Sequence, residues 1–219
     1  EEARQSGLLF LNEVGLDPGI DHMSAMKIID HIHAGGGNVI EFYSICGALP
    51  APEAVDNPLG YKFSWSPRGV LLASRNNAVY RKKGKMVSVD STDLFKSRFN
   101  YDFPGIGTLE VYPNRDSVSY LDIYGIGEAQ TIYRGTFRYR GWCESLDALK
   151  NLNMLDDTLI HCSGMTYSGF LAERAGTDTT DLKTIIARSL GIEDDSVPMK
   201  SLEFLGFFSD EKLRYKETT

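Results

Sequence analysis

The chain has 219 residues, a formal net charge of −7 and a hydrophobic content of 42%. This length accommodates one large domain or two small ones. The acidic balance argues against nonspecific binding of nucleic acid, and no apolar run approaches the roughly 18 residues of a membrane span. The first residues, EEARQ, lack the layout of a signal peptide and resemble the tail of a helix, so we expect the chain to start within a larger protein.

Cysteine is sparse. The three cysteines are Cys46, Cys143 and Cys162, and no C-x-x-C motif occurs. This pattern predicts neither a disulfide framework nor a zinc cluster, and it fits a reducing compartment such as the cytoplasm. The four histidines also lack ligand-like spacing, so no metal site is expected.

The first two thirds of the chain are expected to alternate strands and helices. A short apolar run at 7–11 predicts a buried strand. Asp17 followed by Pro18 is typical of a helix start, and the helix after it carries one apolar stripe. Further strands are expected at 38–46, 61–65, 77–81, 85–89, 108–112 and 132–140. Further helices are expected from Pro67, at 116–124 and, in the last third, at 142–155, 165–175, 180–190 and 197–208. This order predicts an α+β fold, a mixed β-sheet flanked by helices and followed by an α-helical extension.

The strand expected at 132–140 and the nearby YPNRDS block at 112–117 stand out in an acidic chain. Four arginines gather there: Arg115, Arg134, Arg138 and Arg140. Side chains of a strand alternate between its faces. One face would carry Arg134, Thr136, Arg138 and Arg140, and the other Tyr133, Phe137 and Tyr139. The aromatic face suits a core and the guanidinium face suits carboxylates or phosphates. The alternative is a solvated edge strand with surface arginines.

Three other residues allow both a structural and a functional interpretation. Asp17 is interpreted first as a helix cap, worth about 1 kcal/mol, and otherwise as a carboxylate at a strand end, where α/β proteins bind ligands. Cys46 is either a buried thiol or an active-site thiol. Trp65 is either a core residue or a platform for a planar ligand.

Two G-x-G motifs, at 105–107 and 125–127, could be mistaken for a dinucleotide fingerprint. Both lack the third glycine and the strand-to-helix context of that fingerprint, so they are interpreted as turns. The residues alone therefore predict no cradle for nucleotide phosphates.

Five blocks, in order, resemble the saccharopine dehydrogenase family of the NADP-dependent, glutamate-forming kind. They are NEVGLDPGIDH at 12–22, CGALPAPE at 46–53, NPLGYKFSWSP at 57–67, YPNRDS at 112–117 and RGTFRY at 134–139. The resemblance implies a fold similar to the C-terminal domain of glyceraldehyde-3-phosphate dehydrogenase. It also implies a division of the chain into a remnant of a Rossmann domain at 1–14, a substrate-binding and dimerisation domain at 15–141, and a helical extension at 142–219. The Rossmann domain itself would be largely absent, which accounts for the missing glycine fingerprint.

The resemblance also implies roles for single residues. Saccharopine, a tricarboxylate, would be contacted by Leu16, Arg115, Thr136, Phe137 and Arg138. NADP would lie against Gly15, Leu16, Asp17 and Trp65. The candidate catalytic residues are Asp17, for water or proton handling, and Cys46 close by.

The implied reaction interconverts saccharopine with L-glutamate and α-aminoadipate semialdehyde, in a homodimer that binds neither nucleic acid nor membrane. We expect this chain alone to be inactive, because the phosphate-binding half is missing. Two alternatives stay open: a related dehydrogenase of another amino-linked carboxylate or polyamine, and a non-catalytic dimerisation module. The location would be mitochondrial rather than cytoplasmic in a parent fused to a lysine–ketoglutarate reductase.

Overall fold

A mixed sheet forms the centre of the computed structural model, which describes residues 1–64 and 66–218. In this part of the chain the sheet has six strands: β1 (Glu41–Cys46), β2 (Ala78–Lys82), β3 (Lys85–Val89), β4 (Phe99–Phe103), β5 (Gly107–Pro113) and β6 (Thr131–Tyr139). Strand β6 organises it. β1 runs parallel to the first part of β6, β5 runs antiparallel to its second part, and β2 meets it at Ile132. The hairpins β2–β3 and β4–β5 complete the sheet, so the predicted mixed α+β fold is confirmed.

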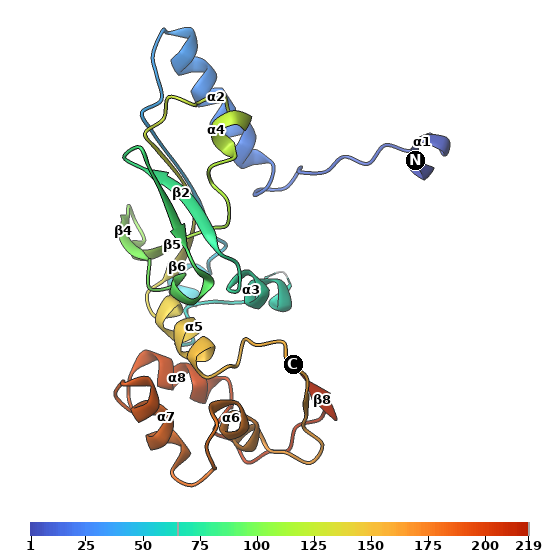
Figure 1. Ribbon diagram of the computed structural model, residues 1–219, viewed down its shortest axis with the longest axis vertical. Helices are drawn as coiled ribbons and strands as arrows, with labels where there is room; N and C mark the ends of the chain where they lie inside the picture. The colour runs from blue at the N-terminus through green and yellow to red at the C-terminus, as the bar shows by residue number, and fades with distance from the viewer. Residues whose placement is uncertain (65, 219) are drawn as a thin grey trace.

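Helices gather at the two ends of this sheet (Figure 1). One end carries α2 (Ile20–Ala34) and α4 (Tyr120–Ile123), and the other carries α5 (Trp142–Asn151), α6 (Tyr167–Ala175), α7 (Leu182–Leu190) and α8 (Val197–Phe204). The remaining elements are α1 (Glu2–Gln5), η1 (Pro52–Ala54), α3 (Pro67–Ala73), η2 (Ser91–Asp93) and a two-stranded sheet of β7 (Ile160–His161) and β8 (Glu217–Thr218). The chain is therefore elongated, with the sheet between two helical regions.

Each helical region has its own hydrophobic core. The smaller core packs α2 and α4 on the first half of β6, with Ile29, Ile126 and Ile132 almost fully buried. The larger core joins the four C-terminal helices to the sheet through Trp142, which contacts the ring of Tyr61 at 4.8 Å between centroids. Because the second core includes residues of both the sheet and the helical extension, the two segments fold against one another.

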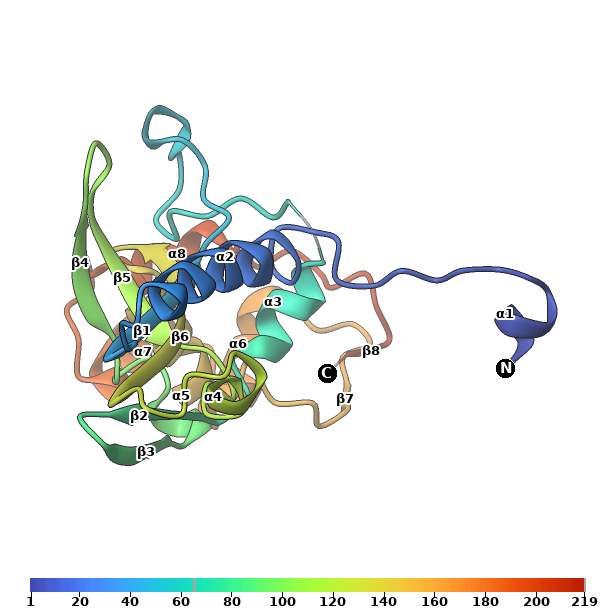
Figure 2. The ribbon, with the colours of Figure 1, turned by 90° about the horizontal axis from the view of Figure 1, so that it is seen from above.

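Several predicted elements are confirmed, and others differ. Ser66 accepts a hydrogen bond from the backbone of Gly69, at 3.1 Å, and so begins α3 as expected. No strand forms at 7–11: the run extends away from the rest of the molecule, where no neighbouring strand pairs with it (Figure 2). Residues 61–64 also form no strand, and Trp65 lies outside the described residues. The strands β4, β7 and β8 are additions that the sequence pattern did not predict.

The two faces of β6 are the reverse of the expectation. The arginine face is covered, because α2, α4, α5 and the segment around Tyr61 pack on it. Tyr133 and Phe137 of the aromatic face instead line an open groove of about 830 Å³, together with rings from β1, β2 and β4, although Tyr133 itself is only 5% exposed. Tyr139 lies outside the groove, where its hydroxyl donates to the carbonyl of Pro50 at 2.9 Å. The prediction that the aromatic face is the core is therefore wrong. The interpretation of β6 as a solvated edge strand is also wrong, because Arg138 is only 7% exposed.

Candidate functional site

A tight turn at 15–19 leads into α2 and presents Asp17 to the sheet. Gly15 and Ile20 are joined by a backbone hydrogen bond of 2.9 Å, and Gly15 donates to the carbonyl of Pro18 at 3.1 Å. The Asp17–Pro18 peptide bond is cis. Gly19 has φ of 146°, and a Cβ there would collide with the backbone of Gly15, so the turn needs glycine.

Asp17 does not cap the helix, contrary to the favoured interpretation. α2 begins at Ile20 with Gly19 as its N-cap residue, and Gly19 donates its N–H to Oδ1 of Asp21 at 2.7 Å. The carboxylate of Asp17 turns instead toward β6 and lies 3.1 Å from Nη2 of Arg134. An opposite charge on the sheet thus takes Asp17 away from the helix end.

Arg134 links two carboxylates to the centre of the sheet. Its Nη2 lies 3.1 Å from Asp17 and 3.5 Å from Asp21. Its guanidinium carbon lies 4.4 Å from the ring centroid of Tyr120, a cation–π contact. The backbone N–H of Arg134 donates to Oγ of Ser117 at 2.8 Å. The hydrogen bond of Ser117 thus fixes the backbone of Arg134, and the ring of Tyr120 fixes its guanidinium.

Cys46 lies beside Asp17 at the end of β1. Burial raises the pKa of this thiol, and the negative charge of Asp17 and a hydrogen bond to its carboxylate raise it further. The thiol is therefore neutral at physiological pH and is placed as a hydrogen-bond donor to the carboxylate rather than as a nucleophile. Cys46 also lies opposite Thr136 of β6 in the parallel register.

An aromatic pair covers the helix side of this cluster. Nδ1 of His22 and the hydroxyl of Tyr124 are hydrogen-bonded at 2.7 Å, and Nε2 of His22 lies 3.9 Å from Asp21. Burial raises the pKa of Tyr124 to about 12, so its hydroxyl keeps its proton at neutral pH. The rings of His22 and Tyr120 stack at 5.7 Å. Arg134 and Asp21 are thus largely shielded from water, with 14% and 12% of their side chains exposed, whereas Asp17 keeps 25% of its side chain exposed.

Arg138 provides a second cation, on the same face of β6. Its guanidinium carbon lies 4.8 Å from the ring centroid of Tyr61 and 5.1 Å from that of Trp142. Nη1 donates to the carbonyl of Phe137 at 2.8 Å, but Arg138 forms no ion pair with a carboxylate of the described residues. Nε of Arg138 and the hydroxyl of Tyr61 are buried, and in residues 1–64 and 66–218 they find no hydrogen-bond partner. Buried donors are normally satisfied, so this pair is equipped to bind an anion.

Not every predicted site residue joins these two groups. Arg115, at φ of 51°, lines a separate hollow of about 410 Å³ between β2, β3 and the turn after β5. Phe137 points into the aromatic groove on the other face of β6. Leu16 is exposed on the turn, Gly15 forms its base, and Thr136 faces the arginine side. Of the predicted site residues, Asp17 lies beside Cys46, Cys46 lies opposite Thr136, and Arg138 shares the face of β6 with Thr136.

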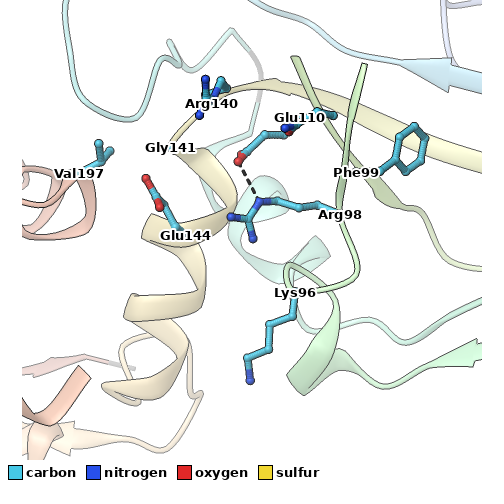
Figure 3. A pocket seen from close by; sticks show the side chains of 9 residues that line it. Lys96, Arg98, Phe99, Glu110, Arg140, Gly141, Glu144 and Val197 are labelled. Atoms are coloured by element: carbon cyan, nitrogen blue, oxygen red, sulfur yellow. Dashed lines mark hydrogen bonds and ion pairs between the residues drawn. The ribbon is translucent and has the colours of Figure 1, made fainter. Parts of the chain in front are cut away.

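A further cavity of about 660 Å³ lies where β4, β5, α5 and α8 meet (Figure 3). Arg140 lines it, away from Asp17. Nε of Arg98 donates to Oε1 of the buried Glu110 at 2.9 Å, and Oε2 of Glu110 accepts the backbone N–H of Cys143 at 3.0 Å. Its lining carries three cations, Lys96, Arg98 and Arg140, and two carboxylates, Glu110 and Glu144. Arg98 is paired with Glu110, and Arg140 is exposed to solvent, so this cavity lacks a buried cation of the kind that Arg138 supplies.

Sequence reasoning placed His22 near a possible site and Arg134 on the guanidinium face without a specific role, and it assigned no role to Asp21 or Tyr124. A signal for one of them exists: Asp21 follows Asp17 by four residues, about one helical turn, in the block DPGID. Among the described residues, no cluster of three or more His, Cys, Asp or Glu side chains could hold a metal ion. Searching the same residues for a helix long and apolar enough to cross a bilayer also finds none.

Comparison with known proteins assigns the family. The profile of the saccharopine dehydrogenase C-terminal domain matches residues 15–218. This chain belongs to that family. Saccharopine dehydrogenase [NADP(+), L-glutamate-forming] of Saccharomyces cerevisiae is 44% identical over 221 residues, which cover 97% of this chain and 49% of that protein. The enzyme of the same name from Schizosaccharomyces pombe is 50% identical over 159 residues, covering 72% of this chain and 35% of that protein.

Two further similarities extend this result. The mitochondrial alpha-aminoadipic semialdehyde synthase of Bos taurus is 38% identical over 229 residues, or 100% of this chain and 24% of that protein. The solved structure of apo histidine-tagged saccharopine dehydrogenase (L-Glu forming) from Saccharomyces cerevisiae superposes with a TM-score of 0.83 at 42% identity, covering 96% of this chain and 49% of that one. The chain spans about half the length of the Saccharomyces cerevisiae enzyme, and its matches cover smaller shares of the other two relatives.

Proposed function

We propose that this chain is the substrate-binding and dimerisation part of an NADP-dependent saccharopine dehydrogenase, which interconverts saccharopine with L-glutamate and α-aminoadipate semialdehyde. The single observation that carries this proposal is the buried guanidinium of Arg138, which has no carboxylate partner among the described residues and whose charge acts on the thiol of Cys46. A tricarboxylate substrate supplies the anion that this group lacks.

The reacting centre of such a substrate is a secondary amine. Loss of hydride from the carbon beside its nitrogen leaves a positive iminium, and addition of water then releases glutamate and the aldehyde. Asp17 and Asp21 share one guanidinium, so their three charges sum to −1. This residual negative charge stabilises a positive charge that develops on the substrate nitrogen. Asp17 is also placed to take a proton from the amine or from the attacking water, with the neutral thiol of Cys46 as its hydrogen-bond donor.

The residues of this chain fit only the reactive end of NADP. The exposed apolar run from Leu8 to Leu11 suits an edge strand of a nucleotide-binding sheet, and Leu9 is 87% exposed. The sequence holds no phosphate-binding glycine loop, and Trp65, the proposed platform for nicotinamide, is outside the described residues. NADP, when bound, accepts the hydride.

The aromatic groove supports the dimerisation part of the proposal. Tyr43, Phe99, Tyr101 and Phe103 expose 37–48% of their surfaces on one face of the sheet. Apart from the peripheral Lys82 and Arg98 the lining is uncharged, so a second copy can meet it without like-charge repulsion. Tyr101→Glu is expected to convert a dimer to a monomer in analytical ultracentrifugation, whereas Phe204→Glu, on an exposed position of α8, leaves the dimer intact. If the Tyr101→Glu variant is still a dimer, the groove is not the dimer interface.

A steady-state assay tests the catalytic part. The complete protein that contains this chain is expected to reduce NADP⁺ with saccharopine and to release glutamate, while the 219-residue chain alone gives no turnover. Turnover of a polyamine in preference to saccharopine, or no turnover by the complete protein, would refute the proposal.

A further inference from the structure

We infer that Arg134 is a positioning residue of the reaction, which acts through Asp17 rather than by binding substrate. This inference rests on the proposed function, because it takes Asp17 as the group that handles the proton. The inference depends on the contact between Arg134, on the central strand β6, and the carboxylate of Asp17, on the turn before α2.

The link starts from a rigid support. Arg134 sits in β6, paired with Ser44 of β1 on one side, and its carbonyl accepts the N–H of Asn114 at 2.9 Å. With Ser117 holding its own N–H at 2.8 Å, the backbone of Arg134 is fixed in the middle of the sheet. The guanidinium, only 14% exposed, stacks on Tyr120 at 4.4 Å. Side chain and backbone together allow it little freedom.

The turn that carries Asp17 needs this support. On its N-terminal side, the run at 8–14 makes no strand and extends away from the sheet. On its C-terminal side, Asp21 fixes Gly19 by the hydrogen bond of 2.7 Å. Arg134 binds both Asp17 and Asp21, so the same Nη2 that orients Asp17 also ties the start of α2 to β6. Breaking this contact releases Asp17 from the site while most of the turn's own hydrogen bonds remain.

Arg134 differs from Arg138 in how its charge is used. Among the described residues, Nε is buried without a partner in both arginines, but Nη2 of Arg134 already lies beside two carboxylates, whereas Arg138 has no carboxylate partner there. A third carboxylate, from substrate, would therefore be repelled by Asp17 and Asp21 at Arg134 and attracted at Arg138. The geometry assigns positioning to Arg134 and substrate binding to Arg138.

A double-mutant cycle in the complete protein tests this division. The variants are Arg134→Gln, Asp17→Asn and the two combined, with Arg140→Gln as the control, since Arg140 follows the end of β6 and lines a separate cavity beside α5. Arg134→Gln is expected to lower kcat about 100-fold, the scale of a misplaced catalytic group, with the KM for saccharopine changed less than threefold. Asp17→Asn is expected to lower kcat by at least as much. The combined variant is expected to equal Asp17→Asn alone, because Arg134 then has no catalytic group to orient.

Each other outcome has a defined meaning. Losses that multiply in the combined variant, or a rise in KM without a fall in kcat, overturn the inference and make Arg134 a substrate ligand. If Arg134→Gln leaves kcat unchanged while Asp17→Asn lowers it, the inference about Arg134 is overturned and the role proposed for Asp17 stands. An unaltered Asp17→Asn overturns both the inference and the role proposed for Asp17. If Arg134→Gln does not fold, as judged by its melting temperature, Arg134→Lys takes its place: it keeps the charge without the fork, and its expected tenfold loss of kcat must also vanish in the Asp17→Asn background.

Discussion

Replacing Arg138 by methionine separates binding from stability. Methionine keeps the apolar contact with the rings of Tyr61 and Trp142 but removes the buried guanidinium. In the free protein that guanidinium has one backbone hydrogen bond and two cation–π contacts, set against the cost of burying a charge without a carboxylate. These contributions oppose one another, so the melting temperature is expected to change little.

The affinity for saccharopine should change much more. Loss of one partner of a buried charge pair costs about 2–4 kcal/mol, which corresponds to roughly a 30- to 700-fold rise in Kd. Isothermal titration of the complete protein with saccharopine measures this rise, and titration with NADPH should show an unchanged Kd.

Arg174 provides the matched control. It is also buried, lies over the ring of Phe170 at 5.5 Å and donates to the carbonyl of Thr158 at 3.0 Å, but it belongs to α6 in the C-terminal helices. Arg174→Met should leave both affinities unchanged. The reasoning is refuted if the Arg138→Met variant binds saccharopine with unchanged affinity, or if its affinity for NADPH falls instead.

Three further predictions concern the turn, the thiol and the buried carboxylate. Asp17→Asn removes the negative charge that raises the pKa of Cys46, so the pKa should fall and alkylation of Cys46 by iodoacetamide at pH 8 should become faster; an unchanged rate would mean that burial alone sets this pKa. Gly19→Ala forces a Cβ into the backbone of the turn and should cost about 1–3 kcal/mol of unfolding free energy by urea titration. Gly127→Ala, in open space, is its control, and equal costs for the two would contradict the strain. Glu110→Ala leaves the guanidinium of Arg98 without its carboxylate and the backbone N–H of Cys143, in the first turn of α5, without its acceptor. It should lower the free energy of unfolding by about 3 kcal/mol in the same titration, and a loss below about 1 kcal/mol would show that water replaces the carboxylate.

The sequence allowed a prediction of most elements, because local signals specify them. The cap at Ser66 and the hairpin around Gly84 depend on neighbouring residues, and both occur where expected. The run at 7–11 has the composition of a strand but forms none, since a strand needs a partner and periodicity does not reveal one. Alternation along β6 sorted its residues onto the right faces, but it could not say which face the helices would cover.

The site shows the same division between local and distant information. Asp17 followed by proline has the local pattern of a cap, and a partner 117 residues away in the sequence overrides it. Arg138 could be chosen from its family resemblance, and its lack of a carboxylate partner could be seen only in the fold. Arg115 shows the limit of that approach, because its hollow is separate from the Asp17 cluster.

Strand β6 has one further consequence. Its odd-numbered residues Tyr133 and Phe137 form part of the aromatic groove, and the even-numbered Arg134 and Arg138 between them face the carboxylate cluster and the proposed anion site. A protein surface bound to the groove and a ligand bound by the arginines would therefore lie on opposite faces of the same strand, a single sheet thickness apart. Where binding on one side changes the affinity on the other, linkage requires the two changes to be the same factor. Saccharopine should shift the monomer–dimer equilibrium, and protein concentration should shift the affinity for saccharopine.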